Sequence, residues 1–147
     1  MTITQMQCVL LADRHHNLSE GIRILLQSQF PAVVTVADES ALMESALRMQ
    51  PNVVVADLAL TQGESFGWLR RFLERCPGSR VIVLSPYDEY TVKQAAFEAG
   101  AAGFVLKFEI SSQLLRAVSE VLAGRTYLPP ESVKAAAKPK GSDPQPN

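Results

Sequence analysis

The stretch Asn52-Val53-Val54-Val55-Ala56-Asp57-Leu58-Ala59-Leu60 decides the fold of this chain. It contains a short, valine-rich apolar run that ends in a carboxylate. Such a run predicts a strand covered on both faces, as in a parallel sheet between two layers of helices. Because open parallel sheets bind ligands outside the carboxyl ends of their strands, we expect a functional site around Asp57.

Four further apolar runs predict the other strands, at residues 8–12, 33–37, 81–84 and 103–106. Between the strands, apolar residues recur at helical spacing, and a capping-box pattern of Asn17 and Glu20 predicts the start of the first helix. The alternation indicates an α/β fold, a doubly wound five-stranded parallel sheet flanked by five helices. Right-handed crossovers favour the strand order 2-1-3-4-5.

The composition is that of an ordinary globular protein. Of the 147 residues 47% are hydrophobic and 20% are charged, and the formal net charge is -1. This charge balance gives no basic surface for nucleic acid, and no segment reaches the roughly 18 apolar residues of a membrane span. The N-terminus lacks the pattern of a signal peptide, so we expect a cytoplasmic protein without a membrane partner. Cys8 and Cys76 are expected to be small hydrophobic residues.

The composition changes after Gly124. Five of the nine prolines lie between Pro129 and Pro146, and residues 134–147 are rich in alanine, lysine, glycine and proline. We therefore expect one folded domain over residues 1–124 and a linker or disordered tail over residues 125–147.

Polar side chains close four of the predicted strands. They are Asp13, Asp57, Ser85 and Lys107. In a parallel sheet these four strand ends share one edge, so the side chains should converge. Two carboxylates, a hydroxyl and an ammonium group suit phosphoryl transfer, in which a carboxylate can be the nucleophile and the other two groups contact phosphoryl oxygens. Paired acids also suit Mg²⁺.

Several motifs occur in an order and at a spacing that resemble one family. They are Val9-Leu10-Leu11-Ala12-Asp13, Glu20-Gly21-Ile22, Glu98-Ala99-Gly100-Ala101-Ala102-Gly103-Phe104-Val105-Leu106-Lys107 and Gly124-Arg125-Thr126-Tyr127-Leu128. Over about residues 7–128, the chain resembles the receiver domains of two-component response regulators and is most similar to those of NarL/LuxR type. The resemblance implies a flavodoxin-like receiver fold and a signalling protein rather than an enzyme.

The resemblance also implies roles for individual residues. Asp57 would be the phosphoacceptor, which receives a phosphoryl group from a sensor histidine kinase, and Asp13 and Asp57 would bind Mg²⁺. Lys107 would bind the phosphate, Ser85 would be the switch hydroxyl, and Phe104 would be the switch aromatic that turns inward. By the same resemblance, the chain could form a homodimer and would contact DNA only through a helix-turn-helix output domain that follows residues 125–147 and is absent here.

One position departs from the family pattern. Receivers usually carry two adjacent acids after the first strand, whereas this chain has Asp13-Arg14. The two carboxylates Asp13 and Asp57 then face Arg14 and Lys107, so the formal charges of the four groups sum to zero. The interaction energy of two unit charges about 4 Å apart is about 4 kcal/mol at an effective dielectric constant near 20. Arg14 could pair with Asp57, point to solvent, or clamp a phosphate. We expect weakened Mg²⁺ binding or none.

Three further features qualify the function. His15 and His16 are adjacent and cannot form an i, i+4 metal pair, so we expect them to belong to a loop or a helix entry. Pro86 restricts Ser85, and Thr61 stands where proline is common, so the alternative is a pseudo-receiver that acts as a phosphorylation-independent dimerisation or docking module. A flavodoxin-like electron carrier is excluded because the loop after the first strand lacks phosphate-cradling residues.

Overall fold

The computed structural model describes residues 8–61 and 66–129. The elements in chain order are β1 (Cys8–Ala12), α1 (His16–Gln27), β2 (Ala32–Val36), α2 (Glu39–Met49), β3 (Val53–Asp57), α3 (Gly67–Arg75), β4 (Arg80–Ser85), α4 (Tyr90–Glu98), β5 (Gly103–Leu106), a short 3₁₀ helix (Lys107–Glu109) and α5 (Ile110–Leu122). None of the helices in these described segments is long and apolar enough to cross a lipid bilayer.

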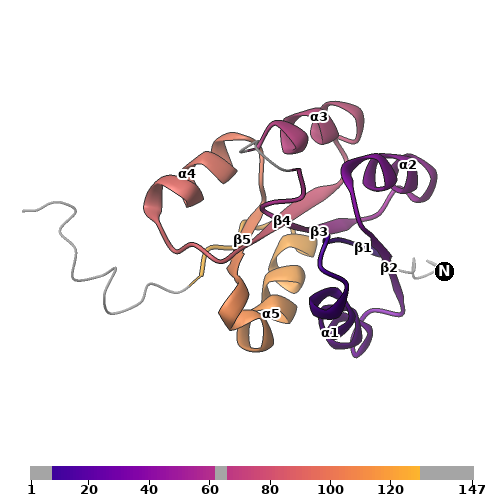
Figure 1. Cartoon of the computed structure of the whole chain (residues 1–147), viewed down its shortest axis with the longest axis horizontal. Coiled ribbons are helices and arrows are strands. Elements are labelled where there is room, and N and C mark those ends of the chain that lie inside the picture. Colours follow the sequence, from indigo (N-terminus) through magenta and orange to yellow (C-terminus); the bar gives the residue numbers. More distant parts are fainter. Residues whose placement is uncertain (1–7, 62–65, 130–147) are drawn as a thin grey trace, which may run out of the picture.

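The five strands form one parallel sheet in the order β2-β1-β3-β4-β5, which confirms the predicted fold class and strand order. Helices α1 and α5 cover one face, and α2, α3 and α4 cover the other (Figure 1). The sheet is therefore the middle of three layers. The strand ends that carry the predicted site residues lie together at one edge of it.

Strand β3 is buried along its whole length because both of its faces are covered. Val53 and Val55 belong to the apolar cluster with α1 and α5, whereas Val54 and Ala56 belong to the cluster with α2, α3 and α4. Full burial of a valine side chain contributes about 1.5–3 kcal/mol. This packing fixes the register of the strand, and the register fixes Asp57 at its end.

The predicted start of the first helix was wrong. Helix α1 begins at His16, and His15 occupies the N-cap position without a side-chain capping bond. The Glu20 carboxylate pairs instead with Arg23 (Oε1 to Nη2, 2.7 Å). The carboxylate that organises this turn is Asp13, whose Oδ1 accepts a hydrogen bond from the His15 backbone N–H at 2.7 Å. The chain thus enters the helix earlier than the capping-box pattern indicated.

The packed part of the chain continues past Gly124, which ends the last helix with a positive φ of 90°. Tyr127 is buried, its N–H donates to Ala102 O (2.9 Å), and its carbonyl accepts from Phe104 N–H (3.0 Å). A Cβ on Gly103 would lie 3.5 Å from the Tyr127 Cβ and 3.0 Å from Ile82 Cγ1, so glycine permits this close approach. The first residues of the expected tail therefore form part of the sheet edge. Residues 130–147 of that tail lie outside the described residues, and the linker assignment stays a prediction.

Candidate functional site

Asp57 ends β3 as a buried carboxylate. Its Oδ1 forms an ion pair with Lys107 Nζ at 2.7 Å, and the Asp57 side chain is only 2% exposed. Lys107 follows β5 and begins the short 3₁₀ helix, so its side chain reaches across the β4 end to the β3 end. The pair brings together the predicted acceptor and the predicted phosphate-binding lysine.

Asp13 ends up beside Asp57 because β1 and β3 are paired neighbours, with Ala12 opposite Ala56. Its side chain is buried, and its Oδ1 lies 3.3 Å from the Nδ1 atom of His15. The backbone bond between His15 N–H and Asp13 Oδ1 folds the loop back on itself, as aspartate often does two residues downstream. His15 is thereby held at the mouth of the pocket, with 64% of its side chain exposed.

The three groups form a possible metal-binding cluster. One ligand atom from each of Asp13, His15 and Asp57 lies within 4.8 Å of the other two. Within the described part of the chain, Oδ2 of Asp13 and Oδ2 of Asp57 are buried without a hydrogen-bond partner. Burying a carboxylate oxygen costs free energy unless a cation or a hydrogen-bond donor contacts it. The three side chains therefore fit a divalent cation.

His15 lies at the entry of α1, as expected, and the structure also brings its side chain next to Asp13 and Asp57, which was not predicted from the sequence. The side chain of His16 lies outside the described residues. The signal in the sequence was the Asp13-x-His15 spacing, since an aspartate commonly accepts from the backbone two residues on. This spacing differs from the i, i+4 histidine pair that marks a metal site on a helix.

Arg14 is exposed to solvent. Among the residues that the structure describes, its guanidinium forms no ion pair with Asp57, whose partner is Lys107. The sequence left three placements open for Arg14, and in the structure its side chain points to solvent. The buried groups of the pocket then carry two negative charges and one positive charge. The repulsion between Arg14 and a bound cation is screened by water, but the missing second acid is not replaced by another carboxylate.

Ser85 lies at the same edge, one residue past Leu84, which pairs with Asp57. Its hydroxyl is buried and occupied locally: Oγ accepts from Tyr87 N–H (2.9 Å) and donates to Tyr87 O (3.1 Å). Phe104 is fully buried among residues of the α2, α3 and α4 layer. In this structure the predicted switch aromatic is thus inward while the predicted switch hydroxyl is bonded to its own loop.

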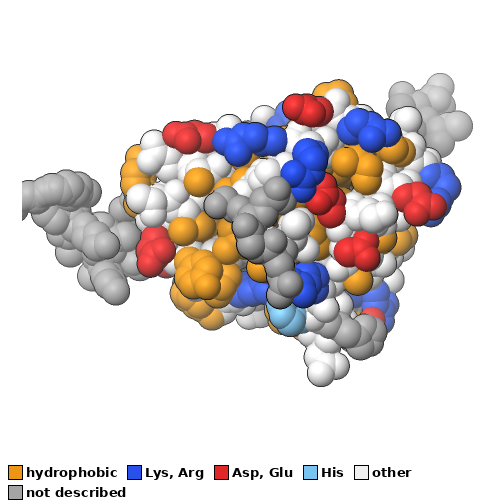
Figure 2. Space-filling view, turned by 45° about the horizontal axis from the view of Figure 1, so that its top comes forward, with side chains coloured by type: hydrophobic (Ala, Val, Ile, Leu, Met, Phe, Trp, Pro, Cys, Tyr) orange, Lys and Arg blue, Asp and Glu red, His pale blue; other side chains and the backbone are white. Residues whose placement is uncertain are grey.

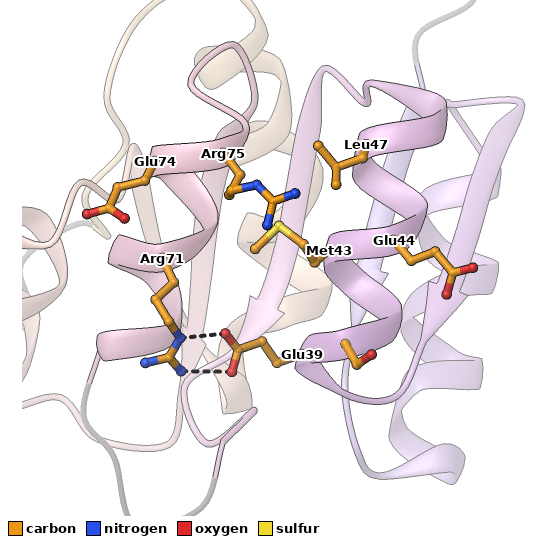
Figure 3. Close-up of a pocket in the computed structure, with 8 residues that line it drawn as sticks. Glu39, Met43, Glu44, Leu47, Arg71, Glu74 and Arg75 are labelled. Atoms are coloured by element: carbon orange, nitrogen blue, oxygen red, sulfur yellow. Dashed lines mark hydrogen bonds and ion pairs between the residues drawn. The ribbon is translucent and has the colours of Figure 1, made fainter.

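A hollow lies between α2 and α3 (Figure 3). The Arg71 guanidinium spans it with two hydrogen bonds to Glu39, at 2.7 Å to Oε2 and 2.8 Å to Oε1. Thr61, four residues beyond Asp57, donates to the same Glu39 Oε1 at 3.4 Å. The loop after the acceptor is therefore connected to the α2–α3 ion pair, but these side chains do not belong to the pocket.

The two cysteines remain outside the chemistry of the site. Burial raises the pKa of both thiols, Cys8 and Cys76, which keeps them protonated and weakly nucleophilic at neutral pH. This agrees with their expected role as small hydrophobic residues.

Comparison with known proteins identifies the family. Residues 9–119 match the model of the response regulator receiver domain. The chain belongs to this family. The receiver domain is 30% identical over 127 residues to the oxygen regulatory protein NreC of Staphylococcus carnosus, an alignment that covers 84% of this chain and 58% of NreC. It is 32% identical over 123 residues to the transcriptional activator DevR/DosR of Mycobacterium tuberculosis, covering 82% of this chain and 56% of that protein. The chain thus spans little more than half the length of these relatives.

Solved structures agree with this assignment. A LuxR-family two-component response regulator from Aurantimonas sp. SI85-9A1 matches with a TM-score of 0.80 and 26% identity, over 94% of this chain and all of that one. The receiver domain of a NarL response regulator from Mycobacterium tuberculosis matches with a TM-score of 0.72 and 26% identity, over 83% of this chain and all of that one. The predicted resemblance to NarL/LuxR-type receivers is confirmed.

Proposed function

We propose that this receiver domain accepts a phosphoryl group on Asp57 from the phosphohistidine of a sensor histidine kinase and relays the signal to a transcriptional output. The observation that carries the proposal is the state of the Asp57 carboxylate. It is buried, Oδ1 is paired with Lys107 at 2.7 Å, and Oδ2 has no hydrogen-bond partner. One oxygen is thus oriented by a cation, while the other has no hydrogen bond to give up when it forms a bond to phosphorus.

In the proposed transfer, an Asp57 carboxylate oxygen forms a bond to phosphorus as the bond between phosphorus and the imidazole nitrogen of the kinase breaks. That nitrogen keeps the electron pair, and the leaving group is neutral imidazole because the other ring nitrogen of the phosphohistidine carries a proton. Lys107 stays charged and moves from the carboxylate toward the new phosphoryl oxygens as a compact point charge. Mg²⁺, which Asp13 and Asp57 would hold, supplies further positive charge when it is bound.

Signal relay in this proposal uses Ser85 and Phe104. To donate to a phosphoryl oxygen, the Ser85 hydroxyl has to give up its bond to the Tyr87 carbonyl, because it has one proton to donate. The aspartyl phosphate offers stronger, charge-assisted bonds in exchange. Phe104, already inward, needs no movement to complete that state. Contact with DNA would come from a separate helix-turn-helix output domain, since this chain spans little more than half the length of its relatives.

The test is phosphoryl incorporation from acetyl phosphate with a divalent cation, read by intact-protein mass. The expected product carries one acid-stable, base-labile phosphoryl group per chain, and Asp57→Asn carries none. Asp13→Asn is the matched control, because it removes the other buried carboxylate and should slow incorporation without moving it from Asp57. Incorporation by Asp57→Asn equal to that of the unchanged chain would refute the proposal.

A second candidate function is a pseudo-receiver that dimerises or docks without phosphorylation. It is favoured by Arg14 in place of an acid and by the Ser85 hydroxyl, which is bonded to Tyr87 beside Pro86. Light scattering distinguishes the two functions. A mass that is the same with and without acetyl phosphate, together with absent incorporation, supports the pseudo-receiver, whereas a phosphorylation-dependent change in mass supports relay through a homodimer.

A further inference from the structure

We propose that His15 replaces the missing acid as a metal ligand, so that the pocket binds a divalent transition-metal ion of the cobalt-to-zinc kind in preference to Mg²⁺. The inference deepens the proposed phosphoacceptor site and rests on that function for its biological meaning. The binding itself is a property of Asp13, His15 and Asp57 that can be measured without any phosphoryl donor.

The geometry of the cluster suits a small cation. Ligand atoms bound at about 2.1 Å lie about 3.0–3.4 Å apart when adjacent and at most about 4.2 Å apart when opposite. His15 Nδ1 and Asp13 Oδ1 are already at 3.3 Å, and all three groups offer ligand atoms within 4.8 Å of one another. Since 64% of the His15 side chain is exposed, its ring can turn toward a bound ion at little cost in packing.

Two independent observations point to a cation rather than to a simple ion pair. The first is that Asp13 Oδ2 and Asp57 Oδ2 are buried and unpartnered, although Lys107 and the His15 backbone satisfy the Oδ1 atoms. The second is that, among the described residues, Lys107 is the one cation paired with Asp57, so two carboxylates and one ammonium group leave a formal charge of -1 in the pocket. A divalent ion would offset this charge and could bind carboxylate oxygens that have no hydrogen-bond partner.

The chemistry of the donors sets the choice of metal. Mg²⁺ prefers oxygen ligands and dehydrates reluctantly, and this pocket offers one carboxylate fewer than the usual receiver pocket. Zinc and cobalt accept imidazole nitrogen and carboxylate oxygen in the same site, and three protein ligands leave a position open for a further oxygen. Figure 2 shows a histidine side chain on the molecular surface close to lysine and arginine side chains, where an incoming anionic oxygen would approach.

The experiment measures metal binding by the whole chain in the absence of phosphoryl donor. Zn²⁺ and Mg²⁺ are titrated calorimetrically, and Co²⁺ is titrated by its visible absorption, which reports the ligand set directly. The expected result is one Zn²⁺ per chain, bound at least about 100-fold more tightly than Mg²⁺. His15→Ala is expected to weaken Zn²⁺ binding at least about tenfold, to alter the Co²⁺ spectrum and to leave Mg²⁺ binding within about twofold.

Two controls separate ligation from other effects. His16→Ala removes the neighbouring imidazole and should change Zn²⁺ affinity by less than about threefold. Thermal unfolding of metal-free His15→Ala should lie close to that of the unchanged chain, because the His15 side chain is 64% exposed, makes no capping bond to α1 and loses only its 3.3 Å contact with Asp13 Oδ1. Asp57→Asn should weaken Zn²⁺ and Mg²⁺ alike.

The proposal is overturned if Zn²⁺ binds no more tightly than Mg²⁺, if His15→Ala binds Zn²⁺ like the unchanged chain, or if His16→Ala loses as much as His15→Ala. These outcomes are distinct from failure of the proposed function. A chain that binds Zn²⁺ through His15 and yet takes up no phosphoryl group refutes phosphoacceptance alone, whereas phosphorylation at Asp57 with oxygen-only Mg²⁺ binding refutes the metal assignment alone.

Discussion

The pocket has two sides that differ in burial and in sequence. The β1 side consists of Asp13, Arg14 and His15, and the β3–β5 side consists of Asp57, Ser85 and Lys107. On the β3–β5 side all three residues are those that the family pattern leads one to expect, and Asp57 and Ser85 are buried. On the β1 side only Asp13 is buried and follows the pattern, while Arg14 and His15 are exposed.

This difference follows from how each side is held. Asp57 and Ser85 belong to central strands whose register is fixed by packing on both faces. Arg14 and His15 belong to a short loop held by local hydrogen bonds, among them His15 N–H to Asp13 Oδ1 and Ser19 N–H to the His15 carbonyl. We therefore expect substitution in that loop to cost less stability than substitution at the buried strand ends. Three substitutions test this comparison.

The largest expected effect concerns Lys107 on the β3–β5 side. Lys107→Met leaves Asp57 buried next to Asp13 without its cation, and we expect unfolding free energy to fall by about 2 kcal/mol at neutral pH. That is less than the roughly 3–5 kcal/mol for a fully buried pair, because the Lys107 side chain is 18% exposed. Urea denaturation measures the change.

A matched control exists on the surface. Lys93 forms an equally short ion pair, 2.7 Å to Asp88 Oδ1, but that acid is 38% exposed. Lys93→Met should cost less than about 1 kcal/mol. In the Asp57→Asn background the cost of Lys107→Met should largely disappear. Equal costs for the two lysines would mean that burial does not distinguish the pocket pair.

An intermediate effect is expected at Arg14 on the β1 side. Arg14→Asp adds a carboxylate next to Asp13 and removes a positive charge, so Mg²⁺ affinity should rise at least about tenfold, or about 1.4 kcal/mol. Calorimetric titration with Mg²⁺ measures the gain. Arg48→Asp, a change of the same charge on the exposed face of α2, is the control and should leave Mg²⁺ affinity nearly unchanged. An unchanged affinity for Arg14→Asp would show that this position does not face the cation site.

The smallest expected effect concerns Ser85. Ser85→Ala removes both hydrogen bonds to Tyr87, leaves the Tyr87 N–H without that acceptor, and should lower stability by about 1 kcal/mol. Ser112→Ala is the control, since Ser112 donates only to Glu109 O (3.2 Å) at an exposed helix start and should cost less than about 0.5 kcal/mol. Denaturant unfolding compares them. Equal stability of Ser85→Ala and the unchanged chain would indicate that the Ser85 loop is not held by this hydroxyl.

The sequence by itself determined the sheet and the identity of the residues at its edge. The apolar runs are long enough for buried strands and are separated by helical periodicity, and the handedness of crossovers then favours the doubly wound order 2-1-3-4-5. Once that order is known, Asp13, Asp57, Ser85 and Lys107 have to lie at the same edge. The contact between Asp57 and Lys107 was therefore predictable in kind, because backbone packing alone positions both residues.

Only the tertiary structure decided what the loop after β1 does. Whether Arg14 or His15 turns toward the acids depends on a turn whose free energy is about that of one hydrogen bond, and hydrophobic periodicity carries no information at that scale. Tyr127 is a second example. The composition predicts that it belongs to a tail, whereas in the structure it forms two backbone hydrogen bonds, with Ala102 and Phe104. The packing of a strand is determined by many apolar residues together, so the sequence pattern reveals it. The direction of a single exposed side chain depends on local contacts that form only when the chain is folded.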